Sequence, residues 1–359
     1  MTAHSTDPLS PTSVRRRLFR WYGKAGRNLP WRAGQGKKPD PYRVWLSEIM
    51  LQQTTVATVK TYFEDFVARW PTVADLARAD LNSVLHAWQG LGYYARARNL
   101  HKCAQVISRE FDGVFPAKEN ELRKLPGIGP YTAAAIAAIA FDLKATPVDG
   151  NFERVMARLH QVETALPEAK LELYGHAEAL TPERRVSNYV QAVMDLGATV
   201  CTPRNPKCTI CPWLPDCRVG GTDKAETYPR RSQSKTKPVR RGVVFWVCDP
   251  RGRVLLRRRE EKGLLGGMIE VPSTEWRQKV WPLKEAVKDA PAASQWQKLP
   301  GIVHHTFTHF HLELKILTGS VSRTAATTGF WCLPEEFGAQ ALPSVMKKVM
   351  AHVAECEDR

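Results

Sequence analysis

Four cysteines lie close together in one part of this 359-residue chain, and their spacing suits a metal or a metal cluster. They follow the pattern C-x6-C-x2-C-x5-C and are Cys201, Cys208, Cys211 and Cys217. Closely spaced thiolates bind zinc or an iron–sulfur cluster, and spacing alone does not choose between the two. Four unliganded thiols are the alternative. The remaining cysteines are scattered, so we expect them to be ordinary packing residues.

Two carboxylates, Glu48 and Asp149, could supply acid–base chemistry. Glu48 lies in the segment 47–54, on a largely apolar predicted helix. Burial there would raise its pKa and suit it to act as a general acid. The alternative is that Glu48 is a surface glutamate that faces solvent. Asp149 stands at the predicted start of a helix, where it could equally serve as an N-cap.

A glycine-rich turn, Leu125–Ala133, lies between two predicted helices. Gly127 and Gly129 lack a Cβ, so backbone N–H groups there can approach a phosphate at a helix N-terminus, which favours anions. Such a turn holds the nucleic-acid backbone without reading its sequence. A simple packing corner between helices is the alternative.

The charge of the chain favours a polyanionic partner. Lys and Arg number 52 against 36 Asp and Glu, which gives a net charge of +16 and a pI of about 9.6. Each phosphate neutralised by such a surface releases counterions, although a generally basic, solubilising surface is the alternative. No apolar run reaches the roughly 18 residues of a membrane span, and the polar N-terminus lacks a signal core. We therefore expect a reducing compartment, where clustered cysteines bind metal more often than they form disulfides.

The elements that must position these residues are helical in the first part of the chain. Apolar residues recur at three-to-four spacing between residues 14 and 200, with breaks at 90–92, 126–130 and 147. The predicted helices are Arg15–Gly23, Tyr42–Trp70, Thr72–Gln89, Ala95–Phe111, Lys118–Leu125, Thr132–Phe141, Asn151–His160, Glu168–Leu180 and Ser187–Leu196.

After a polar, basic stretch at 218–241, the apolar period changes to two. This pattern predicts a hairpin of strands Gly242–Cys248 and Arg253–Arg257, and further alternation over Val303–Thr318. Leu342–Val353 is predicted to be a final helix. The second part of the chain is therefore α+β.

Several of these segments resemble the adenine DNA glycosylase (MutY) family of the helix-hairpin-helix, endonuclease III superfamily. The resemblance rests on the cysteine spacing, the glycine turn, residues 147–151 and the segment Leu91–Leu100, which is similar to the family pattern GLGYYxRARNL. It extends over about residues 14–353.

The resemblance implies a multidomain protein. An all-α helix-hairpin-helix glycosylase core with a four-cysteine 4Fe–4S loop is followed by an α+β Nudix-like C-terminal domain. The implied parts are a disordered tail (1–13), a helical iron–sulfur subdomain (14–30 and 132–217), a six-helix barrel subdomain ending in the hairpin (31–131), a linker (218–241) and the Nudix-like domain (242–359).

The resemblance also implies roles for the reactive residues. The four cysteines would bind one structural 4Fe–4S cluster. Glu48 would protonate adenine, and Asp149 would stabilise the oxocarbenium ion or act as a transient nucleophile, which is the two-carboxylate logic of glycoside hydrolysis. Tyr131 and Asn151 would lie close to Asp149. A strand-cutting relative has a lysine at the position of Tyr131, and a phenol cannot form a Schiff base, so we expect a glycosylase without efficient lyase activity.

Further residues are implied to contact the DNA, in addition to Gly127 and Gly129. A glycosylase that extrudes its target base needs side chains that fill the gap. In the family pattern Gln53 and Tyr93 fill this gap as wedges, and Thr54 and Leu91 contact the 8-oxoguanine side. Trp31 and Arg32 lie near the adenine pocket in that pattern. A position in the core is the alternative for Trp31.

The segment Gly263–Pro272 resembles part of a Nudix domain. A Nudix hydrolase needs a helix with an R-E-x-x-E-E carboxylate cluster for Mg²⁺, which the residues after Pro272 lack, so we expect no nucleotide hydrolysis. The family uses this domain to recognise 8-oxoguanine through a Phe-Ser-His loop. Here Phe307, Thr308 and His309 take its place. Thr308 retains the hydroxyl of the family's serine and adds a methyl group.

The sequence therefore predicts a base-excision-repair enzyme that hydrolyses the N-glycosidic bond of adenine paired with 8-oxoguanine or guanine and leaves an abasic site. We expect a monomer acting on double-stranded DNA in the bacterial cytoplasm, at the nucleoid, with no membrane partner. The alternatives are a thymine or oxidised-pyrimidine glycosylase of the same superfamily, a non-catalytic damaged-DNA-binding protein, and an active Nudix enzyme fused to a DNA-binding domain.

Overall fold

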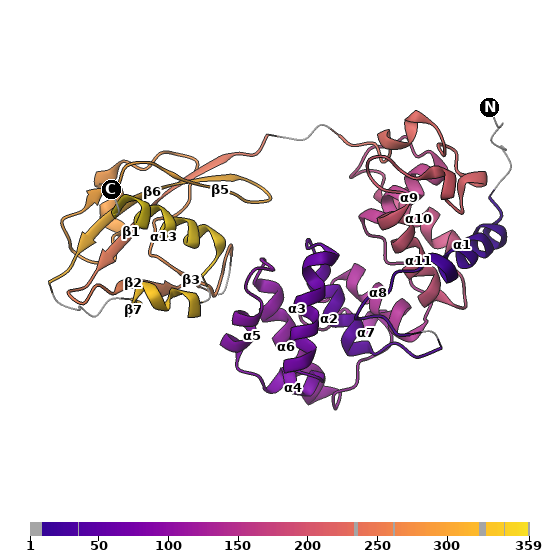
Figure 1. Cartoon of the computed structure of the whole chain (residues 1–359), viewed down its shortest axis with the longest axis horizontal. Helices are drawn as coiled ribbons and strands as arrows, with labels where there is room; N and C mark the ends of the chain where they lie inside the picture. Colours follow the sequence, from indigo (N-terminus) through magenta and orange to yellow (C-terminus); the bar gives the residue numbers. More distant parts are fainter. Residues whose placement is uncertain are drawn as a thin grey trace. The chain divides into compact units, whose positions relative to one another are not determined.

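The computed structural model describes residues 9–34, 36–232, 236–260, 263–322, 328–340 and 342–357. Internal contacts divide the chain into two compact units (Figure 1). The first unit comprises residues 1–79 and 99–234, and the second comprises residues 80–98 and 235–359. Residues 1–8 of the predicted tail lie outside the described part of the chain, and the first helix begins at Pro11.

The first unit is helical. Its helices are α1 (Pro11–Ala25), α2 (Pro41–Leu51), α3 (Val56–Arg69), α4 (Val73–Arg78), α7 (Glu119–Leu122), α8 (Pro130–Phe141), α9 (Gly150–His160), α10 (Lys170–Leu180) and α11 (Val186–Thr199), and α6 (Ala95–Glu110) continues into it from the second unit. Helix α8 is rich in alanine and is buried from Thr132 to Ile139. Small side chains on every face let α2 and α11 both pack against α8, which makes it the centre of the unit.

The single helix predicted over Tyr42–Trp70 is wrong, because the chain breaks between Leu51 and Val56. Gln53 adopts a left-handed backbone conformation, with φ of 57°. The Thr55 side chain then accepts a backbone hydrogen bond as the N-cap of α3. The apolar period continues across this break, which is why periodicity alone did not reveal it.

The helix predicted over Thr72–Gln89 is also two helices. Helix α4 ends at Arg78, and α5 (Leu81–Ala87) belongs to the second unit. The Asp80 side chain accepts a hydrogen bond from the backbone N–H of Ser83 at 3.0 Å and caps α5. A local side-chain cap again outweighs the apolar pattern.

The second unit contains a mixed seven-stranded sheet of order β3-β2-β1-β6-β4, in which β5 pairs with β6 and β7 pairs with β2. Only the β1–β6 pair is parallel among the named strands. The strands are β1 (Val239–Cys248), β2 (Val254–Arg258), β3 (Ile269–Glu270), β4 (Gln297–Lys298), β5 (Val303–Thr306), β6 (His311–Ser320) and β7 (Phe330–Cys332), with helices α12 (Leu283–Ala286) and α13 (Ser344–Glu357).

Strand β1 separates two apolar cores. Val244 and Trp246 point into a core that includes residues of α13, whereas Val243 and Phe245 pack with Trp281 on the other face of the sheet. Alternate residues of a strand face opposite sides, so this continuous apolar run is buried on both. Figure 1 shows α13 lying against the sheet.

The predicted β1–β2 hairpin is confirmed, with Cys248 opposite Val254 in antiparallel register. The alternating stretch predicted over Val303–Thr318 is instead two antiparallel strands, β5 and β6. A tight turn over residues 307–310 joins them, and the backbone N–H of Phe307 donates to the carbonyl of Phe310 at 2.9 Å. The final helix begins at Ser344 and continues beyond the predicted end at Val353.

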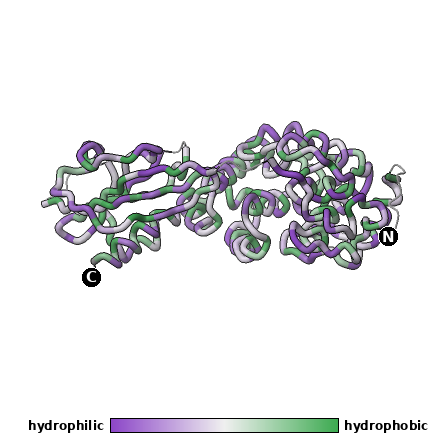
Figure 2. The backbone as a smooth tube through the Cα atoms, turned by 90° about the horizontal axis from the view of Figure 1, so that it is seen from above, coloured by the Kyte–Doolittle hydropathy of each residue, from purple (hydrophilic) through white to green (hydrophobic). Residues whose placement is uncertain are grey.

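Hydrophobic and hydrophilic segments alternate along the backbone (Figure 2). No helix in the described ranges is both long enough and apolar enough to cross a bilayer.

Candidate active site

Asp149 is fixed in place by the start of helix α9, which it caps. Its carboxylate accepts hydrogen bonds from the backbone N–H of Asn151 at 3.0 Å, from that of Phe152 at 2.8 Å and from the side-chain amide of Asn151 at 2.8 Å. Burial raises the pKa of Asp149, while these donors oppose the rise by favouring the charged form. The N-cap interpretation of Asp149 is therefore correct, and the cap orients the carboxylate.

Glu48 lies on α2 and is 7% exposed. Burial, aided by the nearby charge of Asp149, raises its pKa to about 7, although a hydrogen bond with Tyr131 and the charge of Arg32 oppose the rise. Tyr131 lies in the first turn of α8, and burial also raises its pKa well above the ordinary value. Segments far apart in the sequence thus bring Glu48, Tyr131 and Asp149 into mutual interaction. Burial raises the pKa of both carboxyls, while the N–H donors around Asp149 favour its charged form and Glu48 can carry a proton near neutral pH.

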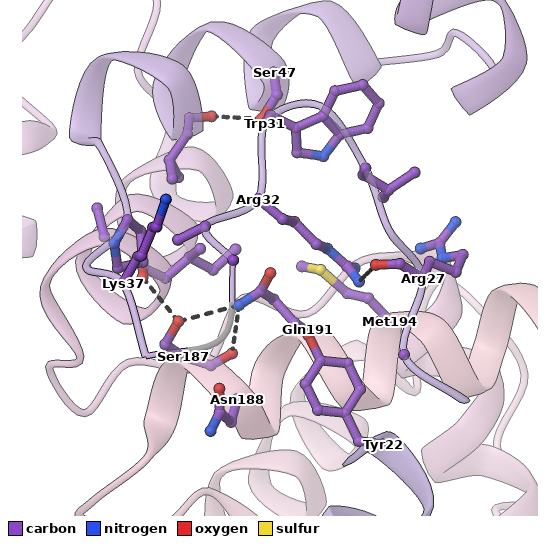
Figure 3. Close-up of a pocket in the computed structure, with 18 of the residues that line it drawn as sticks. Tyr22, Arg27, Trp31, Arg32, Lys37, Ser47, Ser187, Asn188, Gln191 and Met194 are labelled. Carbon is purple, nitrogen blue, oxygen red and sulfur yellow. Dashed lines mark hydrogen bonds between the residues drawn. The ribbon is translucent and has the colours of Figure 1, made fainter. Parts of the chain in front are cut away.

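A cavity of about 940 Å³ opens beside Glu48 within the first unit. Its lining includes the predicted pocket residues Trp31 and Arg32, and Figure 3 shows Gln191 and Met194 of α11 rising toward Arg32. Trp31 is 7% exposed and packs edge-on against Phe63, with ring centroids 5.4 Å apart, so it belongs to the core and to the cavity wall at once. The volume is within the range of small-molecule sites, about 300–1,000 Å³.

Arg32 is held by a buried carboxylate that the sequence analysis missed. Asp195 on α11 is fully buried and accepts two hydrogen bonds from the Arg32 guanidinium, each 2.7 Å long. It also accepts from the Arg27 side chain at 2.6 Å and from the Arg27 backbone N–H at 2.8 Å. Burial alone would raise the pKa of Asp195, but these bonds and charges lower it. The ion pair keeps a charged guanidinium fixed at the cavity wall.

Arginines of α9 connect this site to the four-cysteine loop. Arg154 donates to the Asn151 side-chain oxygen at 2.8 Å and to the carbonyl of Cys201 at 2.7 Å. Arg158 is 2% exposed and donates to the Cys201 sulfur at 3.3 Å and to the carbonyl of Thr202 at 2.7 Å. Helix α9 therefore carries Asp149 at its start, and arginines of its later turns hydrogen-bond to the cysteine loop.

All four cysteines of the loop line one small cavity, together with Arg158. Within the ranges that the structure describes, no three His, Cys, Asp or Glu side chains converge closely enough to bind a single metal ion. Thiols that share a cavity without meeting at one point fit a polynuclear cluster better than a zinc ion, whose four ligands each lie about 2.3 Å from the metal. The donors present thus suit an iron–sulfur cluster.

The glycine turn has the expected helical surroundings. Gly127 has φ of 75°, and a Cβ there would lie 2.6 Å from the Cβ of Asn99, so both backbone conformation and space require glycine. Gly129 is the N-cap residue of α8 and is exposed, with open space around it. This leaves the N-terminus of α8 accessible to an anion.

The predicted DNA-contact residues Gln53 and Thr54 both lie in the break between α2 and α3. Gln53 is exposed and Thr54 is half-buried. The neighbouring Gln52 donates from its side chain to the Thr132 hydroxyl at 3.3 Å, which ties this break to α8. The helix break that periodicity missed is what presents Gln53 at the surface.

Leu91 and Tyr93 lie in the second unit, in the segment before α6. Leu91 is buried, whereas Tyr93 is 48% exposed and has φ of 48°. Arg96 donates to the carbonyls of Leu91 and Gly92 at 2.9 and 3.2 Å, and its guanidinium lies 5.3 Å from the Trp88 ring centroid. Arg96 therefore holds the loop that carries Tyr93.

The predicted reading residues Phe307, Thr308 and His309 form the turn between β5 and β6. Thr308 and His309 are exposed at its tip, and Phe307 is half-buried behind them. The hydroxyls of Tyr93 and Thr308 are hydrogen-bonded to each other. The second unit thus brings one predicted wedge and one predicted reading residue together.

The Nudix-like segment carries no catalytic carboxylate helix in the described range 263–322. The first helix after Pro272 is the short α12, whose single acid is Glu285. Glu270 is 1% exposed and is paired with Arg257 and Arg259. A carboxylate bound by two arginines is not free to coordinate Mg²⁺.

The sequence analysis missed the residues that hold the site rather than those that form it. These are Arg27, Arg154, Arg158, Gln191, Met194 and Asp195. Asp195 did carry a signal, because it is an acid within an apolar helical segment, as Glu48 is.

We predict that the purified protein contains iron and acid-labile sulfide in equal amounts and shows a broad visible absorbance band. Cys211→Ser is expected to lose the iron and the band and to lower the melting temperature, because cluster binding contributes to folding free energy. Cys356→Ser, outside the four-cysteine loop, is the control and should retain the iron. Stoichiometric zinc in the wild-type protein would contradict the prediction.

Comparisons with known proteins agree with this geometry. Residues 46–179 match the HhH-GPD superfamily of base excision DNA repair proteins, residues 201–217 match the iron–sulfur binding domain of endonuclease III, and residues 243–352 match the NUDIX domain. The fold is therefore a helix-hairpin-helix glycosylase core followed by a Nudix domain, and the protein has a 4Fe–4S cluster, whose binding domain matches residues 201–217.

Relatives and a solved structure extend the match over most of the chain. The adenine DNA glycosylase of Homo sapiens is 34% identical over 406 residues, covering 96% of this chain and 74% of its own length. That of Buchnera aphidicola (Schizaphis graminum) is 32% identical over 343 residues, covering 93% and 96%. The structure of a thermostable thymine-DNA glycosylase aligns with 58% of this chain and 95% of its own, at 28% identity and a TM-score of 0.52. With both carboxylates, the cysteine loop and the Nudix domain in place, the chain belongs to the adenine DNA glycosylase family.

Proposed function

We propose that this enzyme hydrolyses the N-glycosidic bond of adenine opposite 8-oxoguanine, or opposite guanine, in double-stranded DNA and leaves an abasic site. The observation that carries the proposal is Glu48, which has a pKa of about 7, lines a cavity of about 940 Å³ and interacts electrostatically with Asp149. We further propose that it acts as a monomer at the nucleoid of a bacterial cell, which fits its net charge of +16.

In the proposed reaction, protonated Glu48 donates its proton to the adenine ring, which makes the base a better leaving group. Asp149 remains ionised and faces the positive charge that develops on the sugar. Two unit charges about 4 Å apart, at an effective dielectric constant of about 20, attract by about 4 kcal/mol. That energy corresponds to roughly a thousandfold in rate. Water then completes hydrolysis, directly or after transient attack by Asp149 on the sugar.

Other residues have positioning and recognition roles in this proposal. Tyr131 orients Glu48. Asn151 orients Asp149 through a hydrogen bond of 2.8 Å that its side-chain amide donates to the carboxylate. Trp31 and Arg32 contact the adenine. The remaining DNA contacts come from the hairpin glycines, from the wedges Gln53 and Tyr93, and from Thr54, Leu91, Phe307, Thr308 and His309 on the side of the opposite base.

The direct test is single-turnover excision of adenine opposite 8-oxoguanine, guanine and thymine, with release of thymine from mismatched duplexes measured in parallel. We expect adenine to be released, fastest opposite 8-oxoguanine. Release of thymine would favour the pyrimidine glycosylase, and binding without release of any base would favour a non-catalytic protein.

Replacing the aspartate tests its electrostatic role. Asp149→Asn is expected to lower the excision rate by at least roughly a thousandfold, because the amide cannot stabilise the oxocarbenium ion. Affinity for duplex DNA, measured by a gel-shift titration, should remain near the wild-type value. Excision by this variant at the wild-type rate would refute the assignment.

The pH dependence of excision tests the acid. The active form of Glu48 is protonated, and its raised pKa keeps that form populated up to about pH 7, so the single-turnover rate should fall as pH rises through 7. Glu48→Gln should remove this dependence and lower the rate by roughly 100- to 10,000-fold. A wild-type rate that stays constant from about pH 6 to about pH 8.5 would contradict the role of Glu48.

Borohydride trapping tests the absence of lyase chemistry. Wild-type protein should give little covalent complex with DNA, because the Tyr131 phenol cannot form a Schiff base with the sugar. Tyr131→Lys places an amine near Asp149 and should increase the yield of the trapped complex. A high trapped yield from the wild-type protein would show that another amine performs this chemistry.

A further inference from the structure

The turn that joins β5 to β6 is short and presents Thr308 and His309 at its tip. A main-chain bond of 2.9 Å closes it between Phe307 and Phe310, and a bond of 3.0 Å between the Thr306 hydroxyl and the His311 ring closes its base. These bonds set the path of the backbone.

Aromatic and cationic side chains form a continuous row behind this tip, which we name the turn stack. The Arg259 guanidinium lies 5.1 Å from the Trp276 ring centroid, and the Trp276 and Phe307 centroids are 5.9 Å apart. The Phe307 and Phe310 rings are stacked, with centroids 4.8 Å apart and planes inclined by 29°. The Arg240 guanidinium lies 4.5 Å from the Phe310 centroid and completes the row.

Both ends of the turn stack are attached to the domain. Arg259 is ion-paired with buried Glu270, which Arg257 also binds at 2.8 Å. Arg240 lies on β1, whose parallel pairing with β6 places it opposite Leu312. Trp276 and Phe310 are buried in the core shared with α13. Because its members are held by the sheet and the core, the stack restrains the position of Phe307, one residue before the tip.

We propose that the turn stack, with Arg240 and Phe310 as its positioning residues, holds the tip residues in the orientation that distinguishes 8-oxoguanine from guanine opposite adenine. This inference rests on the proposed function. A hydrogen bond from the Thr308 hydroxyl weakens steeply when donor and acceptor move out of line, so discrimination depends on how firmly the tip is held. A guanidinium over the exposed end of the stack stabilises the ring face by cation–π attraction.

The test compares single-turnover excision opposite 8-oxoguanine with that opposite guanine, expressed as a ratio of rates. Arg240→Met and Phe310→Leu are expected to lower this ratio by up to about tenfold, the contribution of one hydrogen bond, while excision opposite guanine stays near the wild-type rate. Arg240→Lys retains the cation and should restore part of the ratio. Arg241→Met is the matched control, because Arg241 is adjacent on β1 but pairs with Glu313 at 2.9 Å.

A second measurement follows the order of the turn in the protein without DNA. Hydrogen exchange of amides in residues 303–311 should be faster in Arg240→Met and Phe310→Leu than in wild type or Arg241→Met, and the melting temperature of Arg240→Met should stay close to that of wild type. Unchanged exchange together with an unchanged ratio would overturn the proposal. Equal loss of excision on both substrates would also overturn it, since that result indicates general DNA contact by Arg240. A wild-type ratio near one, with faster exchange in the variants, would instead refute the 8-oxoguanine preference and leave the stack as a device that orders the turn.

Discussion

The start of helix α9 is the constraint on which the proposed chemistry of this protein depends. Its first backbone N–H groups must be satisfied, and the Asp149 carboxylate satisfies two of them while a side-chain amide adds a third donor. The same interactions that stabilise the helix therefore fix the orientation of the carboxylate. Further along the helix, Arg154 and Arg158 bind the loop that holds the iron–sulfur cluster. The cysteine loop thus anchors the helix that presents Asp149.

The two carboxylates differ because their surroundings differ. Glu48 is enclosed by the first unit, where burial outweighs the bond from Tyr131 and the charge of Arg32, so its pKa rises to about 7. Asp149 is also desolvated, but several N–H donors favour its charged form. The charge of Arg32 is itself balanced by Asp195, which keeps a guanidinium at the cavity wall. The N–H donors thus favour the charged form of Asp149, whereas Glu48, with a pKa of about 7, can carry a proton near neutral pH.

The second unit is built on a different physical basis. Its sheet buries apolar residues on both faces of β1, and this rigid layer supports a turn whose exposed tip carries the predicted reading residues. The Nudix domain lacks a free carboxylate cluster in its described residues, and Glu270 binds arginines instead.

The sequence by itself determined the features that depend on neighbouring residues. The cysteine spacing, the glycine turn, the N-cap position of Asp149 and the β1–β2 hairpin are all local, and each was expected from a few adjacent residue types. Periodicity failed where a short cap interrupts it, as at Thr55 and Asp80, because apolar spacing continues through such breaks. Only the tertiary structure decided the burial of Glu48, the pairing of Arg32 with Asp195 and the row of rings behind Thr308. These depend on side chains far apart in the chain, whose contacts, desolvation and charges exist only once the helices and strands have packed.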